Sequence, residues 1–487
     1  MTDGQWLRLD PRMLLVHPID EIRKYLVPLL AAAVFGATQG GNPLFALAAV
    51  GIPLGLGVVR YLTTSYRITD GRVELRRGLL NRQLLSTPTD RVRTIDLEST
   101  PIHRLVGLTT MTIGTGGGGL SDNLKLDGLE SGHAQQLRSL LLADSAVAAE
   151  EVGGDAAAGL PGLPPPAATY EHRWLRFAPF TSTGIVIFGG AVGGGTQLLG
   201  ELDIDVDAIA EDVAAQATVV VLAATVALGL LVLALTVLGY LVTNWAFTLQ
   251  RHPDTWHVSR GLLTTRETTL DVDRLAGVSV SEPPGLRLAR GARLSAIVTG
   301  LDKGQSGSEV LVPPAPDAVV RRAAAGVLGT DRPASGPLEK HGPAAVRRRW
   351  VRALLPAVVP AAVLVAAVVG GAPAPLLVLP VLLLAGAAAL AADRARSLGH
   401  AVVDGYLVTR SGSLLRHRDA LAAGHVIGWT TTDTWFQRRS GLTTLAATTA
   451  GGQGKVEALD VPAERAVEVA HGLTPELVGQ FLASSVC

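Results

Sequence analysis

A glycine-rich run, Gly114 to Gly119, has the spacing G-x-G-x-x-G. In a nucleotide-binding fold this spacing brings a helix N-terminus to a pyrophosphate, which requires a helix directly after the run. Here the run is followed by a strand-like segment, Leu120 to Asp127. We therefore interpret it as a hairpin loop and not as a cofactor site.

The other residues that could do chemistry are dispersed along the chain. The histidines lack the close spacing of a metal-binding helix, and the single cysteine, Cys487, excludes an intramolecular disulfide or a cysteine-based zinc cage. We find no serine in a G-x-S-x-G turn and no paired carboxylates suited to acid-base work. The sequence predicts a protein that is not an enzyme and has no cofactor or metal.

Arginines that lie between long apolar runs are the more informative polar residues. A basic group beside an anionic membrane leaflet can contribute ~1 kcal/mol to binding. The candidate lipid- or partner-binding residues are Arg91, Arg93, Arg104, Arg274, Arg287 and Arg438. The alternative is that Arg91, Arg274 and Arg104 form weak surface ion pairs with Asp90, Asp273 or Glu98.

The chain contains one unit three times. Arg77-Gly78-Leu79-Leu80 reappears as Arg260-Gly261-Leu262-Leu263, a shift of 183 (260 minus 77), and a shift of 334 takes Gly78 to Gly412 (412 minus 78). Internal repeats of this kind decide how the rest of a sequence is interpreted. The repeat signature, which we expect to be structural, comprises Gly78, Gly107, Leu108, Gly261, Gly412, Gly441 and Leu442.

Each copy begins with a pair of apolar runs. The chain has 48% hydrophobic and 17% charged residues, which is too apolar for an ordinary soluble enzyme of 487 residues. The apolar residues form six runs near the ~20 residues that an α-helix needs to cross a bilayer. We predict six transmembrane helices in three hairpins, at residues 25–62, 173–243 and 347–393.

The flanking charges predict the orientation of these hairpins. Arginines gather at the ends of the hairpins that lie away from the connection between the two paired runs, whereas the connection at 200–213 is acidic. Basic flanks resist translocation across the membrane. We expect a multi-pass protein of the bacterial cytoplasmic membrane, with an N-terminal segment 1–24 and both termini in the cytoplasm and with 200–213 as an extracytoplasmic loop. Trp174, Tyr240, Trp245 and Trp350 either lie in the headgroup zone or pack domains on helix ends.

A polar segment follows each hairpin, at residues 63–145, 244–329 and 394–487. Each contains short alternating stretches, such as Tyr66 to Leu75 and Val92 to Leu97, and ends in a short helix. The fold class predicted is an α+β membrane protein whose three antiparallel β-sandwich domains are each closed by a C-terminal helix. The linkers 146–172 and 330–346 are expected to be plain spacers.

The motif after the second apolar run carries a family resemblance. Arg104-Leu105-Val106-Gly107-Leu108-Thr109-Thr110, and its third copy Arg438-Arg439-Ser440-Gly441-Leu442-Thr443-Thr444, are similar to the bacterial pleckstrin-homology-like domain of YdbT-like membrane proteins. The resemblance covers nearly the whole chain and implies three PH-like domains, each preceded by paired membrane helices. Copy two, Pro283 to Gly291, is interpreted as having one inserted residue before its glycine.

Repetition without catalytic residues favours a docking scaffold. We expect the three cytoplasmic domains to dock a membrane or cytoplasmic protein, in envelope stress or in defence against toxic compounds. The alternatives are a sensor of anionic lipid headgroups and an accessory subunit of a transporter. Membrane lipids are expected partners, nucleic acid is not, because the net charge is +0, and the sequence leaves the oligomeric state open.

Overall fold

The structure is a computed structural model of the full chain. It describes residues 6–14, 16, 55, 58–59, 61–69, 71–78, 83–88, 92, 94–114, 124–138, 141, 165–181, 211–299 and 310–482. The chain forms two compact units: unit 1 is Met1–Pro166, Trp245–Arg274 and Gly300–Ser308, and unit 2 is Ala167–Asn244, Leu275–Thr299 and Glu309–Cys487. The second repeat is therefore divided between the units, and each unit is described by itself.

In unit 1, the first repeat has two antiparallel sheets. The first has the strand order β1-β2-β3-β4, with β1 at Leu7–Arg8, β2 at Ser65–Thr69, β3 at Arg72–Arg77 and β4 at Gln83–Pro88. The second contains β5 (Thr94–Ser99), β6 (Leu108–Gly114) and β7 (Leu124–Glu130), with helix α4 (Pro101–Val106) between β5 and β6. A helix at 131–138 follows β7, as the sequence predicts.

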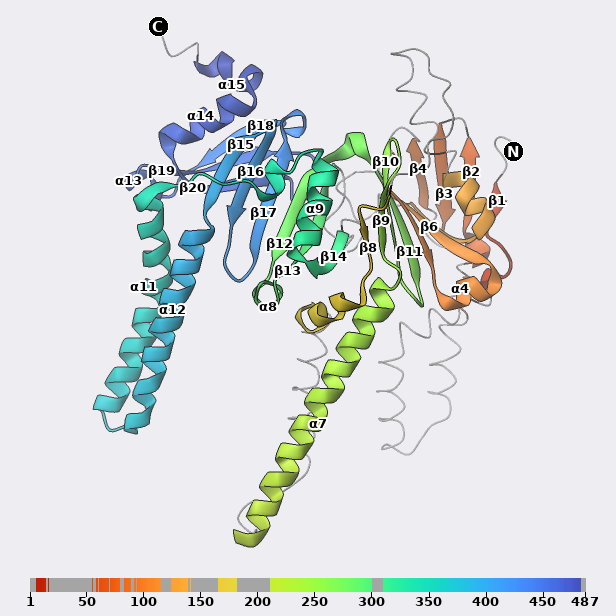
Figure 1. Cartoon of the computed structure of the whole chain (residues 1–487). Helices are drawn as coiled ribbons and strands as arrows, with labels where there is room; N and C mark the ends of the chain where they lie inside the picture. The colour runs from red at the N-terminus through yellow and green to blue at the C-terminus, as the bar shows by residue number, and fades with distance from the viewer. Residues whose placement is uncertain are drawn as a thin grey trace. The chain divides into compact units, whose positions relative to one another are not determined.

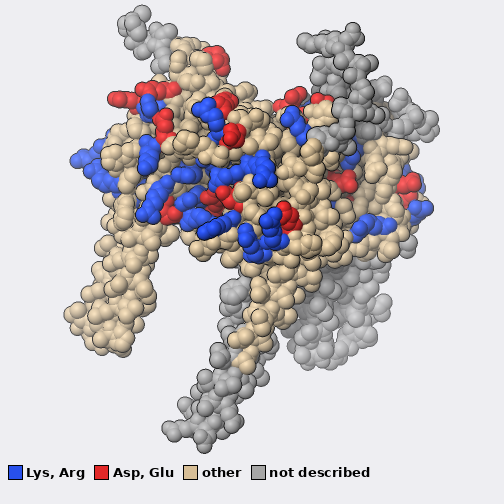
Figure 2. Space-filling model, viewed as in Figure 1, with Lys and Arg blue, Asp and Glu red and all other residues tan. Residues whose placement is uncertain are grey.

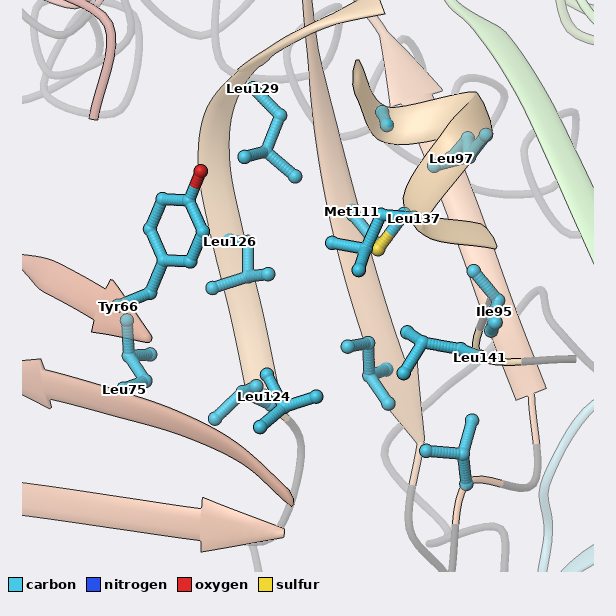
Figure 3. Close-up of a cluster of buried hydrophobic side chains, with 14 of the residues drawn as sticks. Tyr66, Leu75, Ile95, Leu97, Met111, Leu124, Leu126, Leu129, Leu137 and Leu141 are labelled. Atoms are coloured by element: carbon cyan, nitrogen blue, oxygen red, sulfur yellow. The ribbon is translucent and has the colours of Figure 1, made fainter. Parts of the chain in front are cut away.

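A shared core joins the two sheets of the first repeat. Tyr66 and Leu75 from the first sheet belong to one buried cluster with Met111 and Leu126 from the second, and Leu137 of the closing helix covers it (Figure 3). The predicted sandwich closed by a helix is thus present in this repeat. Its second sheet begins at Thr94, two residues later than the predicted Val92.

The N-terminal segment is part of the first repeat. Leu7 of β1 pairs with Tyr66 of β2, and Leu9, Met13 and Val16 are buried. The sequence predicts only a polar segment here, because its apolar residues are too few to show a period. The described part of it extends the first sheet.

The second sheet of unit 1 continues into the second repeat. Its strands beyond β5 are β11 (Thr265–Asp271), β10 (Thr255–Arg260) and β9 (Thr248–Arg251), so the order is β7-β6-β5-β11-β10-β9. The cross-repeat pair β5 with β11 is antiparallel. Strands of neighbouring repeats therefore share one hydrogen-bonded sheet.

Unit 2 repeats this arrangement between the second and third repeats. Its larger sheet has the order β14-β13-β12-β17-β16-β15, where β12 is Leu275–Glu282, β13 Gly291–Val298, β14 Val310–Pro316, β15 Gly399–Val403, β16 Tyr406–Ser411 and β17 Arg416–Ala422. Helix α8 (Pro284–Leu288) links β12 to β13. Helix α9 (Asp317–Leu328) closes the second repeat, where the sequence predicts a helix from about Asp317 to Leu328. The pair β12 with β17 crosses from the second repeat to the third.

The third repeat has its second sheet in the order β18-β19-β20. These strands are Gly428–Thr432, Leu442–Thr448 and Lys455–Pro462, with α13 (Trp435–Arg439) before β19 and the helices α14 (Ala463–Leu473) and α15 (Pro475–Leu482) after β20. Leu407 and Leu421 of the larger sheet share a core with Leu445 and with Val469 of α14. This repeat is also a sandwich covered by its closing helix.

Three described helices are long and apolar enough to cross a membrane: the part Val226–Asn244 of α7 (Glu211–Asn244), α11 (Gly342–Val369), and a segment Ala374–Ser397 that includes α12 (Val378–Ser397). Helices α11 and α12 form a hairpin below the third repeat (Figure 1), and α11 continues through Pro356 and Pro360. Figure 2 shows the charged side chains over the β-rich parts and few on these helices. Most of the first hairpin and most of the predicted third span lie outside the described residues.

Three predicted boundaries are wrong. Residues His172–Phe180, taken partly as the third span, form the 3-10 helix η2, in which Phe177 and Trp174 are fully buried. Helix α7 already begins at Glu211, inside the predicted loop 200–213. The predicted spacer 330–346 contains helix α10 (Arg332–Ser335) with Ala334 buried.

Candidate functional site

The signature glycines occupy a left-handed backbone conformation. Gly107 has φ +74° directly after α4, and Gly441 has φ +63° directly after Ser440, the C-cap of α13. A left-handed conformation is costly for residues with a Cβ. The carbonyl oxygens of both glycines accept from the first residue of the closing helix: Ser131 donates to Gly107 and Ala463 to Gly441. These glycines thus join the short helix to the closing helix.

The second repeat keeps the same spacing with a different residue. Arg290, at a shift of 183 from Gly107 (290 minus 107), has φ +57°, and Asp317 donates to its carbonyl oxygen. The predicted insertion before Gly291 is therefore wrong. An arginine has replaced the glycine in a left-handed position, and Gly291 begins β13, as Leu108 begins β6.

The other signature glycines share a positive φ in all three repeats. Gly78, Gly261 and Gly412 have φ of +101°, +112° and +91°. A Cβ on Gly261 would lie 2.0 Å from the carbonyl oxygen of Thr264, and one on Gly412 1.9 Å from that of Leu415. Glycine is required there because the chain returns too closely for any side chain.

Arg104, a candidate binding residue, contacts the next repeat. Its Nη2 donates to the carbonyl oxygens of Leu262 at 2.6 Å and Leu263 at 2.8 Å, in the turn between β10 and β11. The predicted partner Glu98 instead pairs with Arg266 across the β5–β11 contact at 2.9 Å. Arg104 therefore joins the first repeat to the second through these hydrogen bonds.

Arg287 makes the equivalent contact in unit 2. Its Nη1 donates to Asp393 at 3.1 Å and to the carbonyl oxygen of Ser413 at 3.4 Å. Arg104 and Arg287 are related by the shift of 183 (287 minus 104), and Leu262 and Ser413 by a shift of 151 (413 minus 262). The same arginine of consecutive repeats thus binds the same turn of the next repeat.

The remaining candidate arginines differ among themselves. Arg274 pairs with Asp271 at 3.3 Å, and not with the predicted Asp273. Arg438 is exposed, and its side chain has no hydrogen-bond or ion-pair partner among the described residues. Arg91 and Arg93 lie outside the described residues. The structure therefore does not gather the six arginines into one site.

The strand contacts between repeats share one register, and we call them junctions. At the first junction Ser99 of β5 lies opposite Thr265 of β11. At the second, Glu282 of β12 lies opposite Arg416 of β17. The shifts of 183 (282 minus 99) and 151 (416 minus 265) convert the first pair into the second. The two junctions therefore have the same strand register, residue for residue.

Polar contacts accompany both junctions. At the first, Arg138 donates to Glu267 of β11 at 2.9 Å. At the second, Ser279 of β12 donates to Asp419 of β17, and burial raises the pKa of Asp419. Since buried carboxylates need such donors, these contacts favour one alignment of the strands.

Two groups of residues in unit 2 have no counterpart among the predicted sites. Asp460, 1% exposed, binds Arg348 at 2.9 Å and Arg349 at 2.7 Å and also accepts from Gln437. This carboxylate ties the start of α11 to α13 and β20. In the sequence Asp460 is an isolated aspartate, and only the fold brings it close to Arg348 and Arg349.

The second group is an exposed aromatic pair on α13. Trp435 and Phe436 are 60% and 67% exposed, their rings make an edge contact with centroids 5.0 Å apart, and Arg439 lies over the Trp435 ring. The N-cap of α13, Thr434, accepts from Arg348 of α11 at 3.3 Å. Large apolar side chains that are exposed together are typical of an interaction surface.

The bacterial PH domain family model matches residues 25–145, 202–324 and 353–474, which is most of the chain. The chain belongs to the bacterial PH domain family. Each match includes one polar segment and apolar residues before it, so the three repeats are three PH domains. Comparisons with curated proteins and with solved structures find no match.

The predicted headgroup aromatics are partly domain contacts. Trp174 is fully buried, and the hydroxyl of Tyr240 on α7 donates to the carbonyl oxygen of Pro314 at 2.6 Å. For these two residues the packing interpretation is confirmed. Within the described residues, no group of three or more His, Cys, Asp or Glu side chains could hold a metal ion.

Proposed function

We propose that this protein is a non-enzymatic scaffold of the bacterial cytoplasmic membrane, whose three PH domains dock proteins in the cytoplasm. The observation that carries the proposal is the pair of equivalent junctions. They join neighbouring PH domains through continuous sheets, and they use Arg104 and Arg287, which would otherwise be available to ligands. A series of fused domains presents one extended surface and suits docking better than catalysis.

The charges at α11 and α12 support the orientation. Arg347, Arg348, Arg349 and Arg352 lie near the start of α11, and Arg394 and Arg396 lie in the last turn of α12. The opposite ends, around Gly370 and Ala374, have no charged residue. Because basic flanks tend to stay on the cytoplasmic side, this pattern supports our proposal that the third PH domain lies in the cytoplasm.

Site-specific photocrosslinking of the full chain in intact membranes tests the scaffold. A photoreactive amino acid replaces Leu288 or Phe436, which are 84% and 67% exposed on α8 and α13. We expect a defined adduct with one other protein, identified by mass spectrometry. The matched control is Val369, 84% exposed at the end of α11, where only lipid should react. Adducts with lipid or with the chain alone at every position would refute docking.

A lipid-headgroup sensor is the second candidate, and the α13 surface favours it. Trp435 and Phe436 provide apolar rings, and Arg438 and Arg439 provide charge, close to the start of α11. Such a combination binds the interface of an anionic membrane. In a Cys487→Ser background, an environment-sensitive dye at Phe436→Cys should shift to the blue in anionic nanodiscs and not in zwitterionic ones. An equal shift when Arg438 and Arg439 are both replaced by Gln would exclude charge-dependent lipid binding.

A further inference from the structure

Two strands at the ends of their sheets, β4 and β18, lack the neighbouring strand that the equivalent strands of the other PH domains have. By the shifts of 183 and 151, β4 of the first PH domain corresponds to β11 and β17, which are junction strands. In the same way β18 of the third PH domain corresponds to β5 and β12. Within the described residues, β4 pairs with β3 and β18 with β19, and the other edge of each is open.

We propose that β18 of one chain pairs with β4 of a second copy, which makes a third junction between molecules. Applying the register of the two internal junctions places Gly428 opposite Thr87, Thr431 opposite Leu84 and Thr432 opposite Gln83. These pairs occupy the whole of β18 and nearly the whole of β4. The proposal rests on the internal junctions and holds whether or not other proteins dock.

A glycine at the open edge supports this pairing. Gly277 of β12 faces β17 so closely that a Cβ would lie 1.9 Å from the carbonyl oxygen of Ala420. Its equivalent in β18 is Gly428, whose Cβ would meet nothing within 4 Å. Thr94 holds this position at the first junction, so glycine is not obligatory. In β18 it nevertheless leaves room for an approaching strand.

The exposed Arg438 fits the same junction. It is related to Arg104 by the shift of 334 (438 minus 104), and Arg104 and Arg287 each bind the turn of the next PH domain. In a head-to-tail contact, the next PH domain is the first PH domain of a second copy. A head-to-tail contact would therefore supply a partner for an arginine that has none within the described residues.

Apart from Pro88 at the end of β4, neither strand carries the features that normally protect an edge. Natural edge strands are blocked by charged residues, proline or bulges. Residues 83–87 and 428–432 contain no charged residue and no proline, and Pro88 lies beyond the last pair of the proposed register. Leu84 is 59% exposed, and Thr430, Thr431 and Thr432 are exposed. These edges are open to β-augmentation by a strand of matching length.

Such a contact joins different surfaces of the two molecules. A heterologous interface of this kind continues to a third copy and builds rings or linear arrays. Every added chain would contribute three more PH domains to one continuing series of junctions.

Disulfide trapping in intact membranes tests the register. Leu84→Cys and Thr431→Cys chains, each in the Cys487→Ser background and with different tags, are co-expressed and oxidised. Residues directly opposite on neighbouring strands have Cβ atoms close enough for a disulfide, and both positions are exposed, so folding should persist. We expect a disulfide-linked dimer that carries both tags.

The matched control pairs Leu84→Cys with Thr430→Cys, whose side chains point to opposite faces, and we expect at least fivefold less dimer. Arg438→Ala in the Thr431→Cys chain should lower the dimer yield several-fold without changing its thermal unfolding. No dimer, or equal yields for both pairs, would overturn the proposal. A chain with both Leu84→Cys and Thr431→Cys that closes within itself, without forming dimers, would overturn it as well.

Discussion

At the scale of single residues, the left-handed positions show what the family signature does. Gly107, Arg290 and Gly441 occupy one equivalent position, where the carbonyl oxygen accepts from the closing helix. The sequence shows the two glycines, and it suggests an insertion in the second repeat. Only the backbone conformation shows that Arg290 replaces a glycine at unchanged spacing.

This position makes a stability prediction. Gly441→Ala should destabilise the chain by about 1 kcal/mol, because a Cβ disfavours the left-handed conformation. Arg290→Gly should stabilise it by up to about 1 kcal/mol for the same reason. Thermal unfolding of the full chain in detergent measures both, with Gly428→Ala as control, since Gly428 has open space and no positive φ. Equal losses for Gly441→Ala and Gly428→Ala would contradict the assignment.

The buried carboxylate of Asp460 makes a second prediction at this scale. Asp460→Asn leaves Arg348 and Arg349, whose side chains are 11% and 14% exposed, without a counter-charge. Breaking one partner of a buried ion pair costs about 3–5 kcal/mol. The control Glu468→Gln removes an exposed pair with Arg465 and should change the free energy of unfolding by less than about 0.5 kcal/mol. Similar unfolding temperatures for the two variants would argue against a structural role for Asp460.

At the scale of elements, two buried histidines connect α11 to the third PH domain. His341 Nδ1 lies 2.8 Å from the carbonyl oxygen of Leu459, so it donates, and its Nε2 accepts from His400 Nδ1 at 2.9 Å. Burial lowers the pKa of His341 to about 4 and also lowers that of His400. Glu339, Asp460 and Arg465 are the charged groups that influence the pair.

These shifts predict that the free energy of unfolding decreases as the pH is lowered. The pKa of His341 is about 4 when folded and ~6.5 when unfolded, so the unfolded chain binds more protons between these values. Stability should therefore be full above pH 6.5 and fall by about 2 kcal/mol for His341 alone between pH 7 and pH 5. His341→Gln should reduce this loss, and the exposed His471→Gln should retain it, in thermal unfolding at both pH values. An unchanged loss in His341→Gln would disprove the assignment.

The elements also show how far the sequence could predict the fold. Apolar period and turn residues predict strands such as β2 and β3, and they predict the closing helix α9 at its observed residues. Alternation within β5 or β12 shows that each is a strand, but the identity of a partner strand more than 130 residues away is not local information. The short helices α4, α8 and α13 were missed because five or six residues give no helical period.

For the candidate site, the sequence identified the arginines without their partners. Arg104 and Arg287 are at repeat-equivalent positions, and that equivalence could have suggested a shared structural role. Their acceptors are backbone carbonyl groups of Leu262 and Ser413, which leave no mark in a residue pattern. Asp460 was missed for a related reason, since its arginines lie more than 100 residues earlier.

At the scale of the whole molecule, the repeats are joined by strands and not only by linkers. Each of the two units contains one complete PH domain, half of the second one and one junction. The compact units therefore do not follow the sequence repeats. Within each unit, the junction joins strands of two PH domains in one sheet, and this is the basis of the proposed scaffold.

Cysteine pairs across the internal junctions test this central claim most directly. The experiment uses the full chain with Cys487→Ser. Two cysteine pairs place thiols directly opposite each other at equivalent positions of the two junctions: Glu98→Cys with Arg266→Cys, and Ser281→Cys with His417→Cys. We predict that both pairs form intramolecular disulfides in membranes, seen as a mobility shift on non-reducing gels. The off-register pair Glu98→Cys with Glu267→Cys should not. Equal oxidation of the on-register and off-register pairs, or no oxidation at either junction, would contradict the account.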